Sequence, residues 1–130
     1  MGGVHKILVI DDSPEITRLI ASVLGAEGYD VVVSNYPADG QALVRQESPD
    51  LVVLDVCMPE IDGWELCRRI REEHGMPILV LTVLSEVGDI ERTFQAGADA
   101  YMAKPFSIPE FLERVARLLR RGIPRVAEQD

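Results

Sequence analysis

The sequence is poor in cysteine and has no long apolar run, and each shortage excludes a class of protein. Only two cysteines occur in 130 residues, which is too few for a disulfide framework, so we expect reduced thiols that serve packing. No apolar run approaches the roughly 20 residues of a membrane span, because Asp, Glu, Gly or Pro interrupts each one. Without a secretory leader or a span, we expect a soluble, cytoplasmic protein that does not enter a membrane.

Basic residues are also scarce, since 13 Lys and Arg oppose 22 Asp and Glu, giving a formal net charge of −9. A surface of this sign repels phosphates, which argues against binding of nucleic acid by this domain itself. The same charge is compatible with binding a divalent cation.

What the chain does have is a set of short, fully apolar runs rich in Val, Ile and Leu. Runs without period-two alternation are typical of strands buried on both faces, as in a parallel sheet. At this length one domain with its own core is expected. The predicted strands are residues 5–10, 30–34, 51–55, 77–82 and 100–103.

Helical patterns separate these runs. The first helix is opened by Ser13 and Pro14 and closed by Gly28, and its apolar residues recur at helical spacing. The last helix begins with the capping-box pair Ser107 and Glu110. Weaker patterns predict the three middle helices, at residues 37–47, 63–74 and 86–96.

Strict alternation of strand and helix predicts an α/β fold, a doubly wound five-stranded parallel sheet with five helices. Each parallel connection needs a right-handed crossover helix. For the strand order 2-1-3-4-5, ligands bind beyond the carboxyl ends of the first and third strands, where the order reverses.

Five polar residues lie at or just after the ends of the predicted strands, along the edge of the sheet formed by the strand carboxyl ends, here called the rim. Asp11 and Asp12 follow the first strand, Asp55 ends the third, Thr82 ends the fourth and Lys104 follows the fifth. Crowded carboxylates repel, so without a cation at least one is expected to have a raised pKa. Mg²⁺, with Mn²⁺ as an alternative, favours such oxygen ligands. A carboxylate beside Mg²⁺ and a lysine can also attack phosphorus, giving an acyl phosphate.

The whole pattern resembles the receiver domain of two-component response regulators, whose fold is flavodoxin-like. The matching text is Asp11-Asp12-Ser13, Leu54 to Pro59 with Asp62-Gly63, Leu81-Thr82, and Gly97 to Phe106. The resemblance covers residues 4 to about 121, and it implies a receiver domain over residues 1–121 followed by a tail or linker stub over 122–130. All five elements in order form a specific signal.

The resemblance also implies roles. Asp55 would be the phosphoacceptor, and Asp11, Asp12, Asp55 and the backbone carbonyl of Cys57 would hold the metal. Thr82, Tyr101 and Lys104 would be the switch and phosphate-binding residues. A histidine kinase or a histidine phosphotransfer protein would be the phosphoryl donor. The protein would not be an enzyme in the usual sense, because it transfers phosphoryl groups only to and from its own aspartate.

The same resemblance implies an output surface made by the helix near 86–96, the strand at 100–103 and the last helix. That surface would contact an effector domain or a second copy of the chain, through Asp99, Glu110, Arg114 and Arg121. The match to the charged dimer face of winged-helix regulators is incomplete, since Ala100 and Ile90 stand where an acid and a base are usual. A solvated basic face is the alternative reading of the arginines in the last helix.

Other readings stay open at this stage. Asp11 and Asp12 could cap a helix, although Ser13 already serves that purpose. Val83 stands where the family usually has a very small residue, which weakly favours an interaction module that works without phosphorylation.

Cys57 and Leu84, at the positions through which the family tunes hydrolysis, cannot orient water well, so we expect slow self-dephosphorylation. Two enzyme-like alternatives do not fit. A phosphatase would need an Asp-x-Asp after the first strand and a flavin carrier a hydroxyl-rich loop there, whereas the sequence has Asp11-Asp12.

Overall fold

The centre of the molecule is a sheet of five strands, and the computed structural model describes residues 4–59, 61–83 and 86–121, without the side chain of Arg121. The strands are β1 (Lys6–Ile10), β2 (Asp30–Ser34), β3 (Leu51–Leu54), β6 (Ile78–Thr82) and β7 (Ala100–Ala103). They lie in the order β2-β1-β3-β6-β7, and every neighbouring pair is parallel. This is the predicted 2-1-3-4-5 order. The tail predicted over 122–130 lies outside the described residues.

Two further strands were not predicted. β4 (Cys57–Met58) and β5 (Ile61–Asp62) pair antiparallel as a two-residue ladder directly after β3. Strands this short carry no periodic signal in the sequence, so the segment could only be expected to form a loop.

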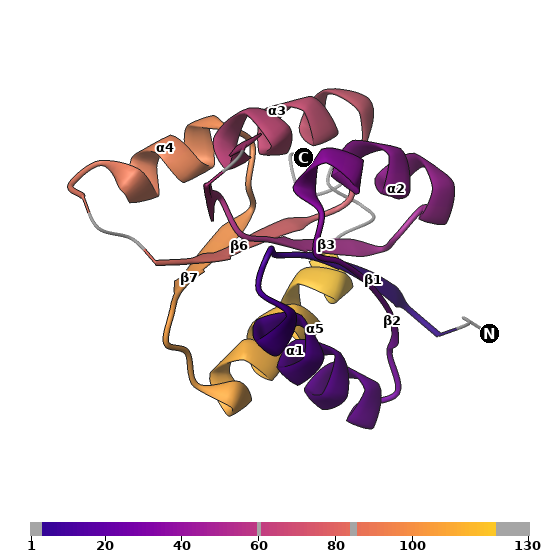
Figure 1. The fold of residues 1–130 in the computed structure, drawn as a ribbon. Coiled ribbons are helices and arrows are strands. Elements are labelled where there is room, and N and C mark those ends of the chain that lie inside the picture. The colour runs from indigo at the N-terminus through magenta and orange to yellow at the C-terminus, as the bar shows by residue number, and fades with distance from the viewer. Residues whose placement is uncertain (1–3, 60, 84–85, 122–130) are drawn as a thin grey trace.

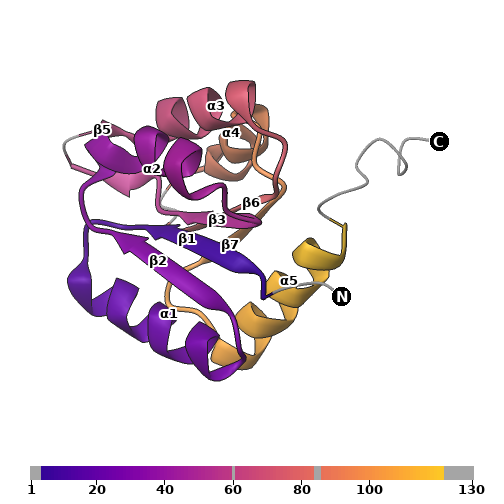
Figure 2. The same ribbon diagram turned by 90° about the vertical axis from the view of Figure 1, so that its right-hand side faces the viewer.

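Helices cover both faces of the sheet. α1 (Pro14–Ala26) and α5 (Ile108–Arg121) lie on one face, and α2 (Gly40–Glu47), α3 (Gly63–Glu73) and α4 (Asp89–Gln95) lie on the other (Figures 1 and 2). Ser13 caps α1 as predicted, because its hydroxyl accepts from the backbone N–H of Ile16. Within the described residues no helix is both long and apolar enough to cross a membrane.

Two helices start later than the sequence indicated. The segment expected to be helical from residue 37 begins with a 3₁₀ turn at Pro37–Asp39 before α2. The helix expected from residue 86 begins at Asp89, because Gly88 has a φ of +98° and ends the preceding turn in the left-handed region. Both differences are at element ends, where local patterns are least informative.

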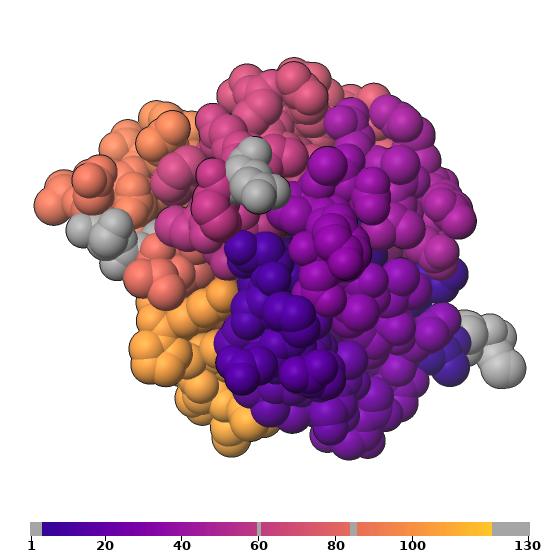
Figure 3. Space-filling model, in the orientation of Figure 1, coloured from indigo at the N-terminus to yellow at the C-terminus, as the bar shows by residue number. Residues whose placement is uncertain are grey.

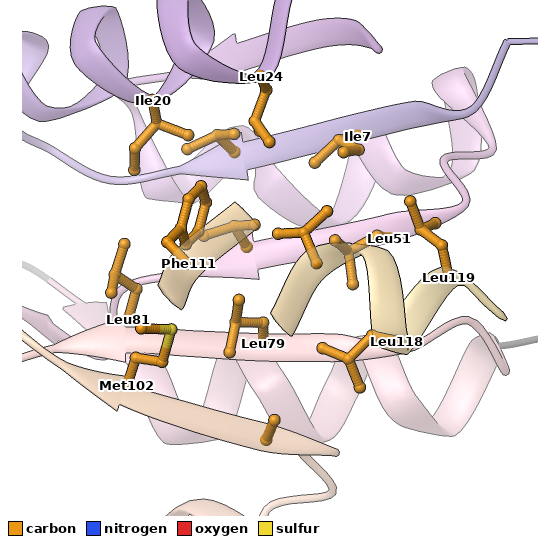
Figure 4. Packing of buried hydrophobic residues seen from close by; sticks show 14 residues of the cluster. Ile7, Ile20, Leu24, Leu51, Leu79, Leu81, Met102, Phe111, Leu118 and Leu119 are labelled. Carbon is orange, nitrogen blue, oxygen red and sulfur yellow. The ribbon is translucent and has the colours of Figure 1, made fainter. Parts of the chain in front are cut away.

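The sheet separates two apolar clusters. On the α1 and α5 side, Phe111 of α5 and Ile20 and Leu24 of α1 pack against side chains of the central strands (Figure 4). On the other side, Leu66 and Ile70 of α3 pack on the sheet. The strands β1, β3 and β6 are buried along almost their whole length, which explains why their sequences are continuously apolar.

The two cysteines differ in their surroundings. Cys67 is buried in the second cluster, and burial raises the pKa of its thiol to about 11, so it packs as an inert apolar side chain. Cys57 is exposed, so the expectation that both thiols serve packing was wrong for this residue. Its position follows from the short ladder of β4, which the sequence did not reveal.

Candidate phosphoacceptor site

The parallel ladders continue one step beyond the strands and fix the backbone of the rim. Asp11 donates its N–H to Ser34 O at 3.1 Å, and Asp55 donates to Ile10 O at 3.0 Å. Lys104 donates to Thr82 O at 2.9 Å. The backbone of each residue is therefore held by the neighbouring strand, and the rigid sheet rather than a free loop positions the polar side chains.

Three acids gather at this rim as predicted. One carboxylate oxygen from each of Asp11, Asp12 and Asp55 lies within 4.8 Å of the others. Asp11 and Asp55 are buried, whereas Asp12 is exposed. Ligands on opposite sides of an octahedral Mg²⁺ are about 4.2 Å apart. The oxygen set therefore fits a divalent ion that is bound directly by some of the acids and through water by the rest.

Lys104 joins two of the acids. Its ammonium lies 2.7 Å from Asp11 Oδ2 and 3.1 Å from Asp55 Oδ2, and the lysine side chain is only 14% exposed. The lysine lies 93 residues beyond Asp11 and 49 beyond Asp55, so only the fold brings these charges together. The ammonium partly offsets the cost of burying two negative charges side by side.

Asp55 is held at both oxygens. Oδ1 accepts the Thr82 hydroxyl at 2.6 Å and the Cys57 N–H at 2.9 Å. The only described partner of Oδ2 is Lys104. Thr82 is fully buried, so its hydroxyl depends on this carboxylate for a partner. One oxygen of Asp55 is thus held by two hydrogen bonds, and the other by the Lys104 ammonium.

The pKa values of the rim follow from burial and from the lysine. Burial is the largest influence on Asp11 and raises the pKa of its carboxyl, while hydrogen bonds from Lys104 and from the Ser13 N–H lower it and the charge of Asp55 raises it. A raised pKa was predicted, but its main cause is desolvation rather than repulsion between the acids. For Lys104, burial is also the largest influence and lowers the pKa, but the combined hydrogen bonds and charges of Asp11 and Asp55 raise it overall.

The predicted switch residues lie on neighbouring strands. Thr82 and Ala103 are paired in register at the ends of β6 and β7, and Tyr101 is paired with Val80. The half-buried ring of Tyr101 makes an edge contact with Phe94 of α4, with ring centroids 6.0 Å apart. The Thr82 hydroxyl donates to Asp55, so this side chain points toward the gathered acids.

Of the four residues expected on an output surface, two lie side by side and a third lies elsewhere. Glu110 and Arg114 line a shallow cavity with Tyr101, and Arg114 donates to the Tyr101 carbonyl at 3.4 Å. Asp99 instead bonds Arg71 of α3 at 2.5 Å and accepts the N–H of Ile78 at 2.9 Å. The Asp99 carboxylate therefore satisfies the first backbone N–H of β6, and its side chain is largely buried.

The side chain of the fourth residue, Arg121, lies outside the described part. Asp99 could not be placed from the sequence, because its partner, Arg71, lies 28 residues away.

Two further features of the structure were not predicted from the sequence. Asn35 follows β2 and donates from Nδ2 to Asp11 O at 2.8 Å and to Thr17 Oγ1 at 3.0 Å. Its position directly after a predicted strand was the available signal. The second feature is Trp64 at the start of α3, whose indole N–H donates to Thr93 Oγ1 at 3.2 Å and whose ring lies 4.0 Å from the Arg92 guanidinium. It connects α3 to α4, and no local pattern indicates this contact.

A parallel sheet of this order with acids, a hydroxyl and a lysine at one rim defines a class of signalling domain, and sequence comparison agrees with it. The family model described as the response regulator receiver domain matches residues 7–116. This chain belongs to that family, the receiver domains of two-component response regulators.

Two curated relatives illustrate the similarity. The DNA-binding dual master transcriptional regulator RpaA of a Synechocystis species is 42% identical over 128 residues, covering 95% of this chain and 53% of that protein. The DNA-binding response regulator MtrA of Mycolicibacterium smegmatis is 37% identical over 124 residues, covering 95% of this chain and 54% of that protein. The chain therefore spans about half the length of the curated relatives it matches.

Solved structures show the same fold. The BeF₃-activated receiver domain of Klebsiella pneumoniae RstA has a TM-score of 0.84 at 36% identity, covering 88% of this chain and 98% of that one. A CheY-like receiver domain from Methanospirillum hungatei has a TM-score of 0.87 at 28% identity, covering 92% and 96%. The predicted doubly wound, flavodoxin-like fold is confirmed.

Proposed function

We propose that Asp55 of this receiver domain accepts a phosphoryl group from a phosphohistidine donor, carried by a histidine kinase or a histidine phosphotransfer protein. The observation that carries the proposal is the gathering of Asp11, Asp12 and Asp55 within 4.8 Å, with the Lys104 ammonium bonded to two of them. Such an arrangement offers a nucleophilic carboxylate beside positive charge, which phosphoryl transfer requires.

In the proposed reaction, Asp55 Oδ2 attacks phosphorus. An oxygen–phosphorus bond forms as the phosphorus–nitrogen bond of the donor imidazole breaks, and the leaving nitrogen takes up a proton. Oδ1 stays anchored by Thr82 and the Cys57 N–H, so the attacking oxygen is positioned before the donor arrives. Lys104 turns from the two carboxylates to the transferred phosphoryl oxygens and stabilises their charge.

The metal would be held by Asp11, Asp12, Asp55 and the backbone carbonyl of Cys57. When bound, Mg²⁺ or Mn²⁺ supplies positive charge next to the phosphoryl oxygens. The buried Asp11, whose pKa is raised, and the exposed Asp12 then gain a partner for their negative charge. The domain acts on its own aspartate only and is not an enzyme for an external substrate.

We further propose that phosphorylation acts on the surface formed by α4, β7 and α5. The Thr82 hydroxyl would change its acceptor from Asp55 to the phosphoryl group, and the contact between Tyr101 and Phe94 would adjust with it. Glu110 and Arg114 would take part in that surface with Arg121, whereas Asp99 is engaged by Arg71. The output would be an effector domain or a second copy of the chain in the cytoplasm, and relatives named as DNA-binding regulators support the former.

The test is incubation with a small acyl phosphate donor and Mg²⁺, followed by intact-mass measurement. Wild type should gain one phosphoryl increment, and Asp55→Asn should gain none. Asp39→Asn is the matched control, because Asp39 is exposed and its side chain makes no helix-capping bond. A phosphoryl increment in Asp55→Asn, or no increment in wild type, would contradict the proposal.

A further inference from the structure

A cavity of about 350 Å³ opens beside the acid rim, and of its lining residues only Asp12 has a role in the function proposed above. It lies between the segment after β2 and the segment after β3, and Asp12 also lines it. Figure 3 shows the face on which these segments meet, the N-terminal one in indigo, the next in purple and the third in magenta. The volume is at the lower end of the range found for small-molecule sites.

The polar side of this cavity presents acceptors. Within the described residues no hydrogen bond or ion pair of the Asp12 carboxylate is found. Asn35 donates both amide hydrogens, to Asp11 O and to Thr17 Oγ1. Its Oδ1 can therefore accept a hydrogen bond from a ligand. A negative carboxylate and an amide oxygen together favour a ligand that is positively charged and carries several N–H donors.

The rest of the cavity is apolar. Pro37, Met58 and Ile61 line it, and so does Tyr36, which is 73% exposed. A hydrated inorganic ion gains nothing from such walls, whereas the carbon body of an organic cation buries apolar area against them. The exposed tyrosine can also stack against a cation.

We propose that this cavity binds a small organic cation, an amidinium or ammonium group carried on an aromatic or aliphatic body. The charged group lies on Asp12 and Asn35, and the body lies against Met58 and Ile61. Because Asp12 also belongs to the proposed metal site, the organic cation and Mg²⁺ exclude each other, and this second part depends on the proposed function. Occupancy of the cavity would then inhibit phosphorylation at low Mg²⁺.

The test uses benzamidine as the probe and benzamide as its uncharged counterpart, with chemical shifts of the ¹⁵N-labelled protein as the readout. In metal-free buffer benzamidine should shift the amides of Asp12, Asn35 and Ile61, and benzamide should not. Ala38→Phe, which places a ring in the cavity from an exposed lining position, should weaken benzamidine binding about fivefold or more. Ala26→Phe, at an exposed position at the end of α1, should leave it unchanged.

Three outcomes would overturn the inference. They are equal shifts with benzamidine and benzamide, shifts confined to other acidic surfaces, and unchanged binding in Ala38→Phe. Competition is tested separately, by titrating benzamidine into protein saturated with Mg²⁺. Because the two ligands exclude each other, the apparent Kd of benzamidine should rise about fivefold or more in saturating Mg²⁺ and should keep rising as more Mg²⁺ is added. A rise that levels off would contradict exclusion. A titration with Mg²⁺ alone tests the proposed function, so protein that binds benzamidine but no metal would refute the latter and leave the cavity site standing.

Discussion

The hydroxyl of Thr82 and the carboxylate of Asp55 are joined by a 2.6 Å hydrogen bond between the ends of two neighbouring strands. Thr82 is fully buried and Asp55 nearly so. A hydrogen bond to a charged group in such surroundings contributes more than a neutral one, because water cannot replace it. The pair therefore contributes to stability as well as to the proposed reaction.

Replacing Thr82 by Val should lower the free energy of unfolding by about 1 to 2 kcal/mol, since the shape is kept and one partner of Asp55 is lost. Urea unfolding at neutral pH measures the change. Thr82→Ser keeps the hydroxyl and should retain the hydrogen bond. Equal stability of Thr82→Val and wild type would mean that this hydrogen bond contributes nothing net.

Replacing Lys104 by Met should lower the free energy of unfolding by about 3 kcal/mol in metal-free buffer, because two buried carboxylates lose their shared cation. Mg²⁺ should restore part of the loss, since it supplies positive charge to the same oxygens. Lys6→Met is the control, because its partly exposed ion pair with Glu47 contributes about 1 kcal/mol or less. A Lys104 variant as stable as the Lys6 variant would contradict this account of the rim.

The raised pKa of Asp11 predicts a dependence of stability on pH. A carboxyl with a higher pKa in the folded state holds its proton more tightly there, so folding loses stability as pH rises through that folded pKa. Asp11→Asn removes this loss. In metal-free buffer its stability relative to wild type should therefore increase from pH 4 to pH 7. Urea unfolding across that range checks the sign, and a difference that stays flat or decreases with pH would disprove it.

The pKa of Lys104 is also raised, but because lysine is a base, the pH range in which its contribution to stability changes lies much higher. Its charged form is favoured by folding, so its contribution is complete below the unfolded pKa near 10.4 and is lost as pH rises through the higher folded value. Between pH 5 and 9 the lysine should therefore add no slope. Lys104→Met should accordingly show a stability deficit that is constant in this range, apart from the titration of its partners.

Gly63 is the first residue of α3, and it packs against the backbone of Val56, the residue after Asp55. A Cβ at this position would lie 2.2 Å from Val56 Cα, so Gly63→Ala should lower the free energy of unfolding by more than about 2 kcal/mol. Gly25, exposed near the end of α1, has no atom within 4 Å of an added Cβ. Gly25→Ala should therefore raise stability by about 0.5 to 1 kcal/mol. Thermal or urea unfolding of both variants decides the comparison.

Loss of the phosphoryl group should be slow. The thiol of Cys57 donates to Val83 O at 3.1 Å, so it does not orient a water molecule for attack on phosphorus. Cys57→Asn should speed the loss about tenfold or more by supplying polar groups that can orient water, and Cys57→Ala should not. Intact mass followed over time after donor removal gives the rates, and loss within seconds in wild type would refute the prediction. Leu84, the other position expected to matter, lies outside the described residues.

Much of the rim could be predicted from the sequence because its residues depend on strand ends. Asp11, Asp55 and Thr82 each follow a buried apolar run, and parallel strands bring their carboxyl ends to one edge. The position of Asp99 could not be predicted, because its partner Arg71 comes from a different element and the choice between them is made by packing. The exposure of the Cys57 thiol could not be predicted either, because it depends on the short ladder of β4 and β5.

Helix ends show the same limit. The 3₁₀ turn at Pro37–Asp39 and the left-handed Gly88 are local backbone features that periodicity does not encode. The cavity beside Asp12 is bordered by three separate segments. Its shape depends on how far apart those segments lie, which no single stretch of sequence determines.

The chain has one tryptophan, and that tryptophan joins α3 to α4 through Arg92 and Thr93. A displacement of α4 would remove the guanidinium from the indole ring or break its N–H bond, and either event alters fluorescence emission. The native protein therefore contains its own optical probe of the proposed output surface. Donor titrations could be followed in real time, in unlabelled protein, by the emission of Trp64.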